Sequence, residues 1–179
     1  MHQNRPPYLV VVMGVAGAGK TTVGRALADD LGLPYADADD FHPQANVTKM
    51  AAGQPLEDAD RLPWLQAVGS WLADHPAGGV VSCSALRRTY RDLLREQAPG
   101  AFFLHLSGDS QVTTARVAER TDHFMPASLV ASQFALLEPL APDETGCVAD
   151  LAAPVSDVVA AARRALAGTA SAVLVGAGQ

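Results

Sequence analysis

The feature that most constrains this chain is residues 8–32, where an apolar run meets a glycine-rich loop and then a helical pattern. Residues 8–13 (YLVVVM) are a continuous run rich in β-branched side chains, which is typical of a strand covered on both faces. Residues 20–32 carry apolar side chains at helical spacing and end at Gly32, a residue that suits a helix C-terminus. The passage therefore predicts a buried strand followed directly by a helix.

The loop between these two elements matches the pattern G-x-x-x-x-G-K-[ST]. Its glycines allow a tight turn whose N–H groups point inward at phosphate, and the helix N-terminus adds the positive end of a dipole. Lys20 is placed to reach the β- and γ-phosphates, and the Thr21 hydroxyl is placed to ligate Mg²⁺. We predict that a nucleoside triphosphate binds at the residues of the pattern: Gly14, Val15, Ala16, Gly17, Ala18, Gly19, Lys20 and Thr21.

A triphosphate loop by itself leaves three functions open: phosphate transfer to a small molecule, hydrolysis by a switch or motor, and nucleotide binding for regulation alone.

The composition of the chain limits the classes of partner that it can bind. The net charge of −6 argues against nucleic acid, which selects basic surfaces, and no stretch approaches the roughly 20 apolar residues of a membrane-spanning helix. The two cysteines show no metal-binding spacing, so we expect a soluble protein of the reducing cytoplasm.

Strand and helix patterns alternate along the whole chain. Further strands are predicted at 34–39, 78–85, 101–107 and 146–152, and helices at 45–52, 62–75, 86–98, 109–121, 127–140 and 155–168. This alternation predicts an α/β fold, with a parallel sheet that carries helices on both faces. We expect one domain over residues 1–168 and a C-terminal tail, 169–179, that is frayed or only loosely docked.

Two acidic residues follow the second predicted strand. Asp37 and Asp39 are two residues apart, so that they project from the same face at the strand end where ligands bind in parallel sheets. One carboxylate suits Mg²⁺, often through water, and the other suits the proton of an attacking hydroxyl. A solvated acidic turn would show the same pattern.

Two groups of basic residues lie near the same predicted edge. Lys49 and Arg61 are placed to hold an anionic substrate or the transferring phosphoryl group. Arg87, Arg88 and Arg91 fall at a helix start, where the dipole disfavours cations, so we expect one or two of them to contact a ligand. A solvated basic face is the competing interpretation.

A third basic pair precedes a break in the helical pattern. Arg116 and Arg120 are one turn apart on one face, and Pro126 closes the break that follows them. We interpret residues 116–128 as a mobile flap whose arginines fold over the triphosphate and stabilise the transition state. Surface pairing of these arginines with neighbouring acidic residues is the rival interpretation.

Several strings in the chain occur together, in this order and spacing, in one family. The chain resembles the gluconokinases, small P-loop kinases related to shikimate and nucleoside monophosphate kinases, over nearly its whole length. The strings that carry the resemblance are DADDFHP (37–43), NVTKM (46–50), GQPLEDADRLPWL (53–65), SCSALRRTYRD (82–92) and HFMPASLVASQFALLE (123–138).

The resemblance implies phosphorylation of D-gluconate by ATP on its terminal hydroxyl, with Mg²⁺, giving 6-phospho-D-gluconate. It also implies a five-stranded parallel sheet of order 2-3-1-4-5 and commonly a homodimer. Carried onto this sequence, it implies the following roles: Gly14 to Thr22, Arg116 and Arg120 for ATP; Lys20, Asp39 and Arg120 for catalysis; Thr21 and Asp37 for Mg²⁺; and Asp39, Lys49, Arg61, Arg87, His123 and Gln133 for the substrate.

The chain departs from the family pattern at the phosphate loop. Ala16 and Ala18 stand where the family usually has serines, so a hydroxyl contact is missing there. No acidic residue follows the third predicted strand, a trait that the family shares, and metal handling then falls to Thr21, Asp37 and water. A kinase for another small hydroxy acid, such as shikimate, and a nucleotide-binding regulator are the alternative functions.

Overall fold

The computed structural model describes residues 7–119 and 128–176. Its strands form one parallel five-stranded sheet of order β2-β3-β1-β4-β5, as the resemblance implied. The strands are β1 (Leu9–Met13), β2 (Tyr35–Asp37), β3 (Gly79–Ser82), β4 (Ala101–Ser107) and β5 (Gly146–Asp150). Because all of them run the same way, their carboxyl ends meet at one edge of the sheet, where ligands bind in such folds.

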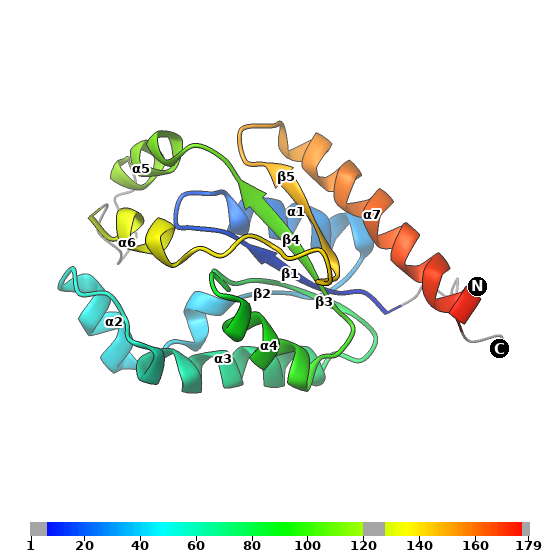
Figure 1. Cartoon of the computed structure of the whole chain (residues 1–179), viewed down its shortest axis with the longest axis horizontal. Helices are drawn as coiled ribbons and strands as arrows, with labels where there is room; N and C mark the ends of the chain where they lie inside the picture. Colours follow the sequence, from blue (N-terminus) through cyan, green and yellow to red (C-terminus); the bar gives the residue numbers. More distant parts are fainter. Residues whose placement is uncertain (1–6, 120–127, 177–179) are drawn as a thin grey trace.

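Helices cover both faces of this sheet (Figure 1). One face carries α1 (Lys20–Leu31) and α7 (Val155–Gly176), and the other carries α3 (Asp58–Ala73) and α4 (Arg88–Gln97). Three shorter helices lie beyond the carboxyl ends of the strands: α2 (Gln44–Ala51), α5 (Ser110–Ala118) and α6 (Ser128–Leu136). A 3₁₀ turn, η1 (Ala38–Phe41), follows β2 directly.

The alternation of side chains along β1 divides the core into two layers. Val10 and Val12 pack with α1 and α7, whereas Val11 and Met13 pack with α3 and α4. All four side chains are fully buried, which explains why β1 is apolar at every position. Because both layers pack against β1, this strand is held on both faces. The loop that follows β1 therefore begins at a firmly held residue.

Three predicted helix boundaries are wrong, and one of them is the end of α6, which lies at Leu136 and not at 140. Helix α3 begins at Asp58 and not at 62, because Glu57 and Asp60 form a reciprocal capping box, and Pro63 consequently lies inside the helix. Helix α7 continues past Gly168 to Gly176, into the predicted tail. Gly168 does not have the positive φ of a C-capping glycine, so it acts as an ordinary helical residue.

No helix within residues 7–119 and 128–176 is long and apolar enough to cross a membrane.

Candidate functional site

The phosphate loop connects β1 to α1 at the carboxyl edge of the sheet. Gly14 and Gly17 have φ values of 148° and 81°, in the region that favours glycine. A Cβ atom at Gly17 would lie 2.5 Å from the carbonyl oxygen of Thr113, so the loop passes too close to α5 for any side chain there. The Lys20 ammonium donates to the Val15 carbonyl over 2.9 Å and thus folds back along the loop.

The two alanines that replace serines are packed against apolar neighbours. Ala16 contacts Val117 of α5 and Val130 of α6, and Ala18 belongs to the core beneath the loop. They are 6% and 1% exposed. A serine hydroxyl would need a hydrogen-bond partner in these surroundings, whereas the methyl groups of Ala16 and Ala18 pack there without one.

The first carboxylate of the site is held by the start of α1. Asp37 ends β2, and its Oδ2 accepts a hydrogen bond of 2.8 Å from the Thr21 hydroxyl. Asp37 lies in register with Ser82, the last residue of β3, whose Oγ donates to the Lys20 carbonyl. Asp37 therefore brings a carboxylate beside the end of β3, which has no acidic residue of its own.

Thr21 and Asp37 fit a magnesium ion by the chemistry of their donor atoms. Mg²⁺ binds through one or two carboxylates, waters and substrate phosphates rather than through a cage of protein ligands. The part of the chain that the structure describes holds no group of three or more His, Cys, Asp or Glu residues suited to a metal.

The second carboxylate, Asp39, lies in the turn after β2. Its backbone N–H donates to Asp37 Oδ1 over 3.1 Å, and its side chain is 40% exposed. His42 Nε2 lies 4.0 Å from Asp39 Oδ1, and the His42 ring stacks on Trp64 with a centroid separation of 4.3 Å. Burial lowers the pKa of His42 despite the nearby charge of Asp39, so the imidazole is neutral at pH 7.

One pocket brings the loop and the acidic turn together. Its polar lining contains the predicted site residues Lys20, Thr21, Asp37, Asp39, Arg61 and Gln133. Its remaining lining is largely apolar and includes Trp64, Met50, Leu56 and Leu129. A small polar ligand with an anionic group and hydroxyls would thus find both charged groups and apolar side chains in this lining.

Two predicted substrate residues lie outside the lining of this pocket. The Lys49 ammonium forms a 2.7 Å ion pair with Asp60, and this contact raises the pKa of Lys49. Arg87 is the residue before α4, and its guanidinium lies 3.4 Å from Asp58. Arg61 shares that aspartate at 3.8 Å but does line the pocket.

Arg88 and Arg91 have structural partners. Arg88 forms two hydrogen bonds to Asp143, of 2.8 and 2.9 Å, and Arg91 is fully buried against Glu144. The prediction that one or two arginines of this group contact a ligand is therefore restricted to Arg87. The positive charges of Arg88 and Arg91 at the start of α4 are compensated by Asp143 and Glu144, which come from a distant segment of the chain.

The predicted flap is described only in part. Arg116 donates to the carbonyl oxygens of Gly17 and Leu151 and lines a second hollow beside the loop, together with Thr22 and Leu151. Arg120 and His123 lie outside the described residues.

Gln133 makes a contact that no local pattern indicated. From α6 its Oε1 accepts a 2.7 Å hydrogen bond from the backbone N–H of Ala16, across 117 residues of sequence. The predicted substrate residue thus touches the phosphate loop directly.

Comparison with known proteins identifies the family. The model of the shikimate kinase family matches residues 16–162. The gluconokinase of Gluconobacter oxydans is 47% identical over 141 residues, which are 77% of this chain and 79% of that protein. The thermoresistant gluconokinase of Escherichia coli is 40% identical over 88% of this chain and 92% of its own length. The chain belongs to the gluconokinase family.

Solved structures agree with the gluconokinase assignment. A gluconokinase from Sinorhizobium meliloti superposes with a TM-score of 0.86 at 44% identity, over 96% of this chain and 98% of that one. A shikimate kinase from Aquifex aeolicus gives a TM-score of 0.62 at 16% identity over 90% and 97% of the two chains, which shows the shared fold alone.

Sequence reasoning missed His42 and Trp64 as residues of the pocket. Both lie in strings that carried the family resemblance, and Trp64 was assigned only to a helix. The Trp64 indole donates to the Ala38 carbonyl over 2.6 Å, which anchors the turn that bears Asp39. Trp64 lies in the string 53–65, and Ala38 and His42 lie in the string 37–43. Because the contacts join residues of two different strings, neither string indicates them by itself.

Proposed function

We propose that this protein transfers the γ-phosphoryl group of ATP to the terminal hydroxyl of D-gluconate, giving 6-phospho-D-gluconate. The observation that carries the proposal is that Lys20, Asp39 and Arg61 line one pocket in a chain of the gluconokinase family. A loop cation, a carboxylate near it and a second cation are what transfer to a hydroxy acid requires.

In the proposed reaction, the loop N–H groups and Lys20 hold the triphosphate. Asp39 accepts the proton of the gluconate hydroxyl as its oxygen attacks in line. Arg61 faces the gluconate carboxylate, because a guanidinium matches a carboxylate with two parallel hydrogen bonds. Trp64, Met50 and Leu56 add apolar side chains to the lining of the same pocket.

Thr21 and Asp37 would hold Mg²⁺, which would neutralise negative charge that develops during phosphoryl transfer. We further propose that Arg116 contacts the nucleotide and that Arg120, from the flap, stabilises the transition state. Contacts of His123 and Gln133 with gluconate belong to the same proposal, as do a homodimeric assembly and a location in the cytoplasm. Lys49 and Arg87, which lie outside the pocket lining and are paired with Asp60 and Asp58, are expected to contribute less to gluconate binding than Arg61.

The test is a coupled assay of ADP release with ATP, Mg²⁺ and one acceptor at a time. The acceptors are D-gluconate, shikimate, glucose and glycerate, with a reaction lacking acceptor as the blank. We expect release that depends on gluconate and a product phosphorylated on its terminal carbon. Lys20→Ala is the matched control, and it is expected to lower turnover at least about 100-fold while the protein remains folded.

Other results would point elsewhere. Release with shikimate or another hydroxy acid would keep the kinase and change its acceptor. A folded protein that binds ATP but releases no ADP with any acceptor would favour the nucleotide-binding regulator instead. Near-normal turnover in Lys20→Ala would remove the proposed role of that ammonium.

A further inference from the structure

Two arginines of the acceptor side meet at one tyrosine. Helices α3 and α4 pack side by side on one face of the sheet (Figure 1), and Tyr90 lies in the first turn of α4. The guanidinium carbon of Arg61 lies 5.5 Å from the centre of the Tyr90 ring, and that of Arg87 lies 5.9 Å from it. Both distances are within the range of cation–π attraction, so one ring serves two positive charges.

The Tyr90 hydroxyl joins Arg61 to a carboxylate. It donates to Asp58 Oδ1 over 2.5 Å, and its oxygen accepts a hydrogen bond of 3.3 Å from Arg61 Nη1. A phenol that donates to a carboxylate is also a better acceptor, because hydrogen bonds in a chain polarise one another. Burial, and after it the hydrogen bond to Asp58, raise the pKa of Tyr90, so the hydroxyl keeps its proton at pH 7. The hydrogen bonds therefore run in one direction, from Arg61 through Tyr90 to Asp58.

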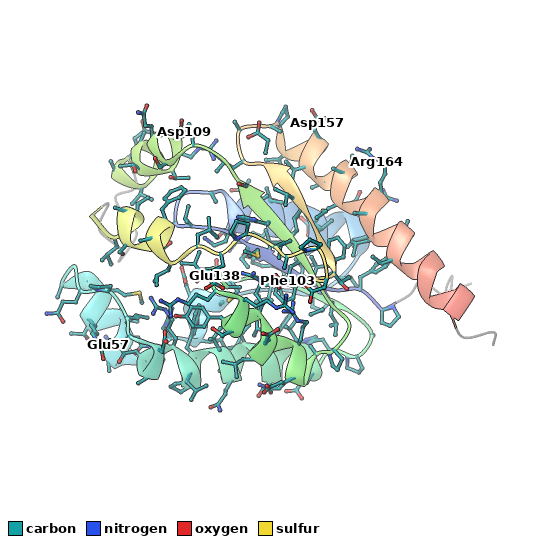
Figure 2. The ribbon with its side chains drawn as sticks, viewed as in Figure 1. Glu57, Phe103, Asp109, Glu138, Asp157 and Arg164 are labelled. Atoms are coloured by element: carbon teal, nitrogen blue, oxygen red, sulfur yellow. The ribbon has the colours of Figure 1, made fainter. Side chains whose placement is uncertain are left out.

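Asp58 is the first residue of α3, where a carboxylate suits the positive end of the helix dipole. Figure 2 shows Glu57, the residue before it, at the start of this helix. Asp58 Oδ1 accepts from Tyr90, and Asp58 Oδ2 accepts from Arg87 Nη1 over 3.4 Å. Arg61 Nη1 lies 3.8 Å from Asp58 Oδ1, which is beyond hydrogen-bond distance. Tyr90 therefore holds Arg61 near a carboxylate that does not bind it directly.

Arg61 keeps hydrogen-bonding capacity that a ligand can use. Its side chain is 12% exposed and lines the pocket. Among the described residues, no carboxylate lies closer to its guanidinium than that of Asp58, and the neighbouring Asp60 is engaged by Lys49 at 2.7 Å. A guanidinium that is so buried and so loosely paired suits the carboxylate of a ligand, which it can bind with two parallel hydrogen bonds.

We propose that Tyr90 is a positioning residue of the acceptor site, whose hydroxyl and ring hold the Arg61 guanidinium where the carboxylate of a sugar acid binds. The inference rests on the proposed function, because it takes gluconate as the acceptor. Tyr90 does not belong to the lining of the pocket, so it acts through Arg61. A long side chain that is already ordered loses less conformational entropy on binding, and Tyr90 thereby increases the affinity for gluconate.

Tyr90→Phe tests this role because it removes the hydroxyl and keeps the ring. We expect the KM for gluconate to rise about 3- to 10-fold, as the loss of one hydrogen bond implies, while kcat and the KM for ATP change less than about 2-fold. The carboxylate of gluconate is remote from the reacting hydroxyl, so its contacts are the same in the ground state and the transition state. Tyr90→Leu also removes the ring and should raise the KM for gluconate further.

The double variant Tyr90→Phe/Arg61→Met separates positioning from a general loosening of the pocket. In the Arg61→Met background, Tyr90→Phe should change the KM for gluconate by less than about 2-fold, because the residue through which it acts is gone. A merely structural role in packing α4 on α3 would raise the KM by the same factor in both backgrounds. Tyr8→Phe, the same change beside the amino end of β1, is the matched control and should leave both KM values unchanged.

The coupled assay of ADP release measures these constants, and melting curves check that each variant is folded. A rise of the KM for gluconate in Tyr90→Phe that is absent in the Arg61→Met background supports the proposal. An unchanged KM in Tyr90→Phe and Tyr90→Leu, an equal rise in both backgrounds, or a loss of kcat in place of the rise in KM overturns it and leaves the proposed function standing. Absence of gluconate-dependent release in the unsubstituted protein would overturn both together.

Discussion

Arg91 and Glu144 form a two-pronged ion pair with N–O distances of 2.7 and 2.8 Å, and neither side chain is exposed. Arg91 also donates to the carbonyl oxygens of Ala85 and Leu86. Ala85 has a φ of 43°, an unusual value for a residue with a Cβ, and Leu86 lines the pocket. The buried pair therefore holds a strained turn at the floor of the site.

Removing one charge of this pair should be costly. Burial by itself disfavours the charged carboxylate, but hydrogen bonds from Arg91, the Ala141 N–H and Arg95 hold the pKa of Glu144 at about 2. Glu144→Leu leaves the Arg91 charge without its partner, so we expect the free energy of unfolding to fall by about 3–5 kcal/mol in urea titrations. Asp143→Asn, which weakens the exposed pair with Arg88, should cost much less.

The double variant Arg91→Met/Glu144→Leu completes this test. It removes both charges and should recover part of the stability lost in Glu144→Leu. If the double variant is less stable than Glu144→Leu, the hydrogen bonds of Arg91 to Ala85 and Leu86 matter more than its pairing with Glu144.

The two carboxylates of the acidic turn should differ in their effect on turnover. We expect Asp39→Asn to lower kcat by about 10²- to 10⁴-fold with little change in ATP affinity, because it removes the proposed proton acceptor. Asp37→Asn should instead raise the Mg²⁺ concentration needed for half-maximal rate, since Asp37 contacts Thr21. Steady-state kinetics at several Mg²⁺ concentrations compare the two. A larger loss of kcat in Asp37→Asn at saturating Mg²⁺ would reverse the roles.

The two predicted cations of the acceptor side should also differ. Arg61 lines the pocket, whereas Lys49 is paired with Asp60. We therefore expect Arg61→Met to raise the KM for gluconate at least about 10-fold, and Lys49→Met to change it much less. The KM for ATP serves as the internal control and should stay within experimental error in both. A larger effect of Lys49→Met would place the gluconate carboxylate nearer α2.

Because His105 is buried, we expect the free energy of unfolding to decrease in mild acid. This residue is 3% exposed on β4, and neither ring nitrogen has a hydrogen-bond partner among the described residues. Burial and the charge of Arg91 lower its pKa, so below about pH 6.5 the unfolded chain binds a proton that the folded chain refuses. The free energy of unfolding should therefore fall as the pH drops from 7 to 5.5, by up to about 1.4 kcal/mol per pH unit for this group.

His105→Leu provides the comparison. Leucine has no group to protonate, so the decrease of the unfolding free energy between pH 7 and 5.5 should be smaller than in the unsubstituted protein. Some decrease should remain, because burial also lowers the pKa of His42. Urea titrations at both pH values measure the difference, and an unchanged decrease in His105→Leu would assign it to other groups.

Most of the fold could be predicted because its signals are local. The run at β1, the glycine loop and the helical spacing of α1 are each read within a few residues, and the structure confirms them. The errors at α3 and α7 have local causes that were misjudged. Pro63 is typical of a helix start, but the Glu57–Asp60 capping box begins α3 upstream of it, and Gly168 is typical of a helix end, but its backbone continues the helix.

The sequence by itself determined the phosphate loop, the parallel sheet and the gluconokinase family, since these depend on residue type and on spacing within short strings. Only the tertiary structure decided which cations reach the pocket. It buried Arg91 against Glu144, paired Lys49 with Asp60, left Arg61 in the lining and set Gln133 on Ala16. The physical reason is that a charged side chain is directed by whichever partner the fold brings near, and those partners come from distant parts of the chain.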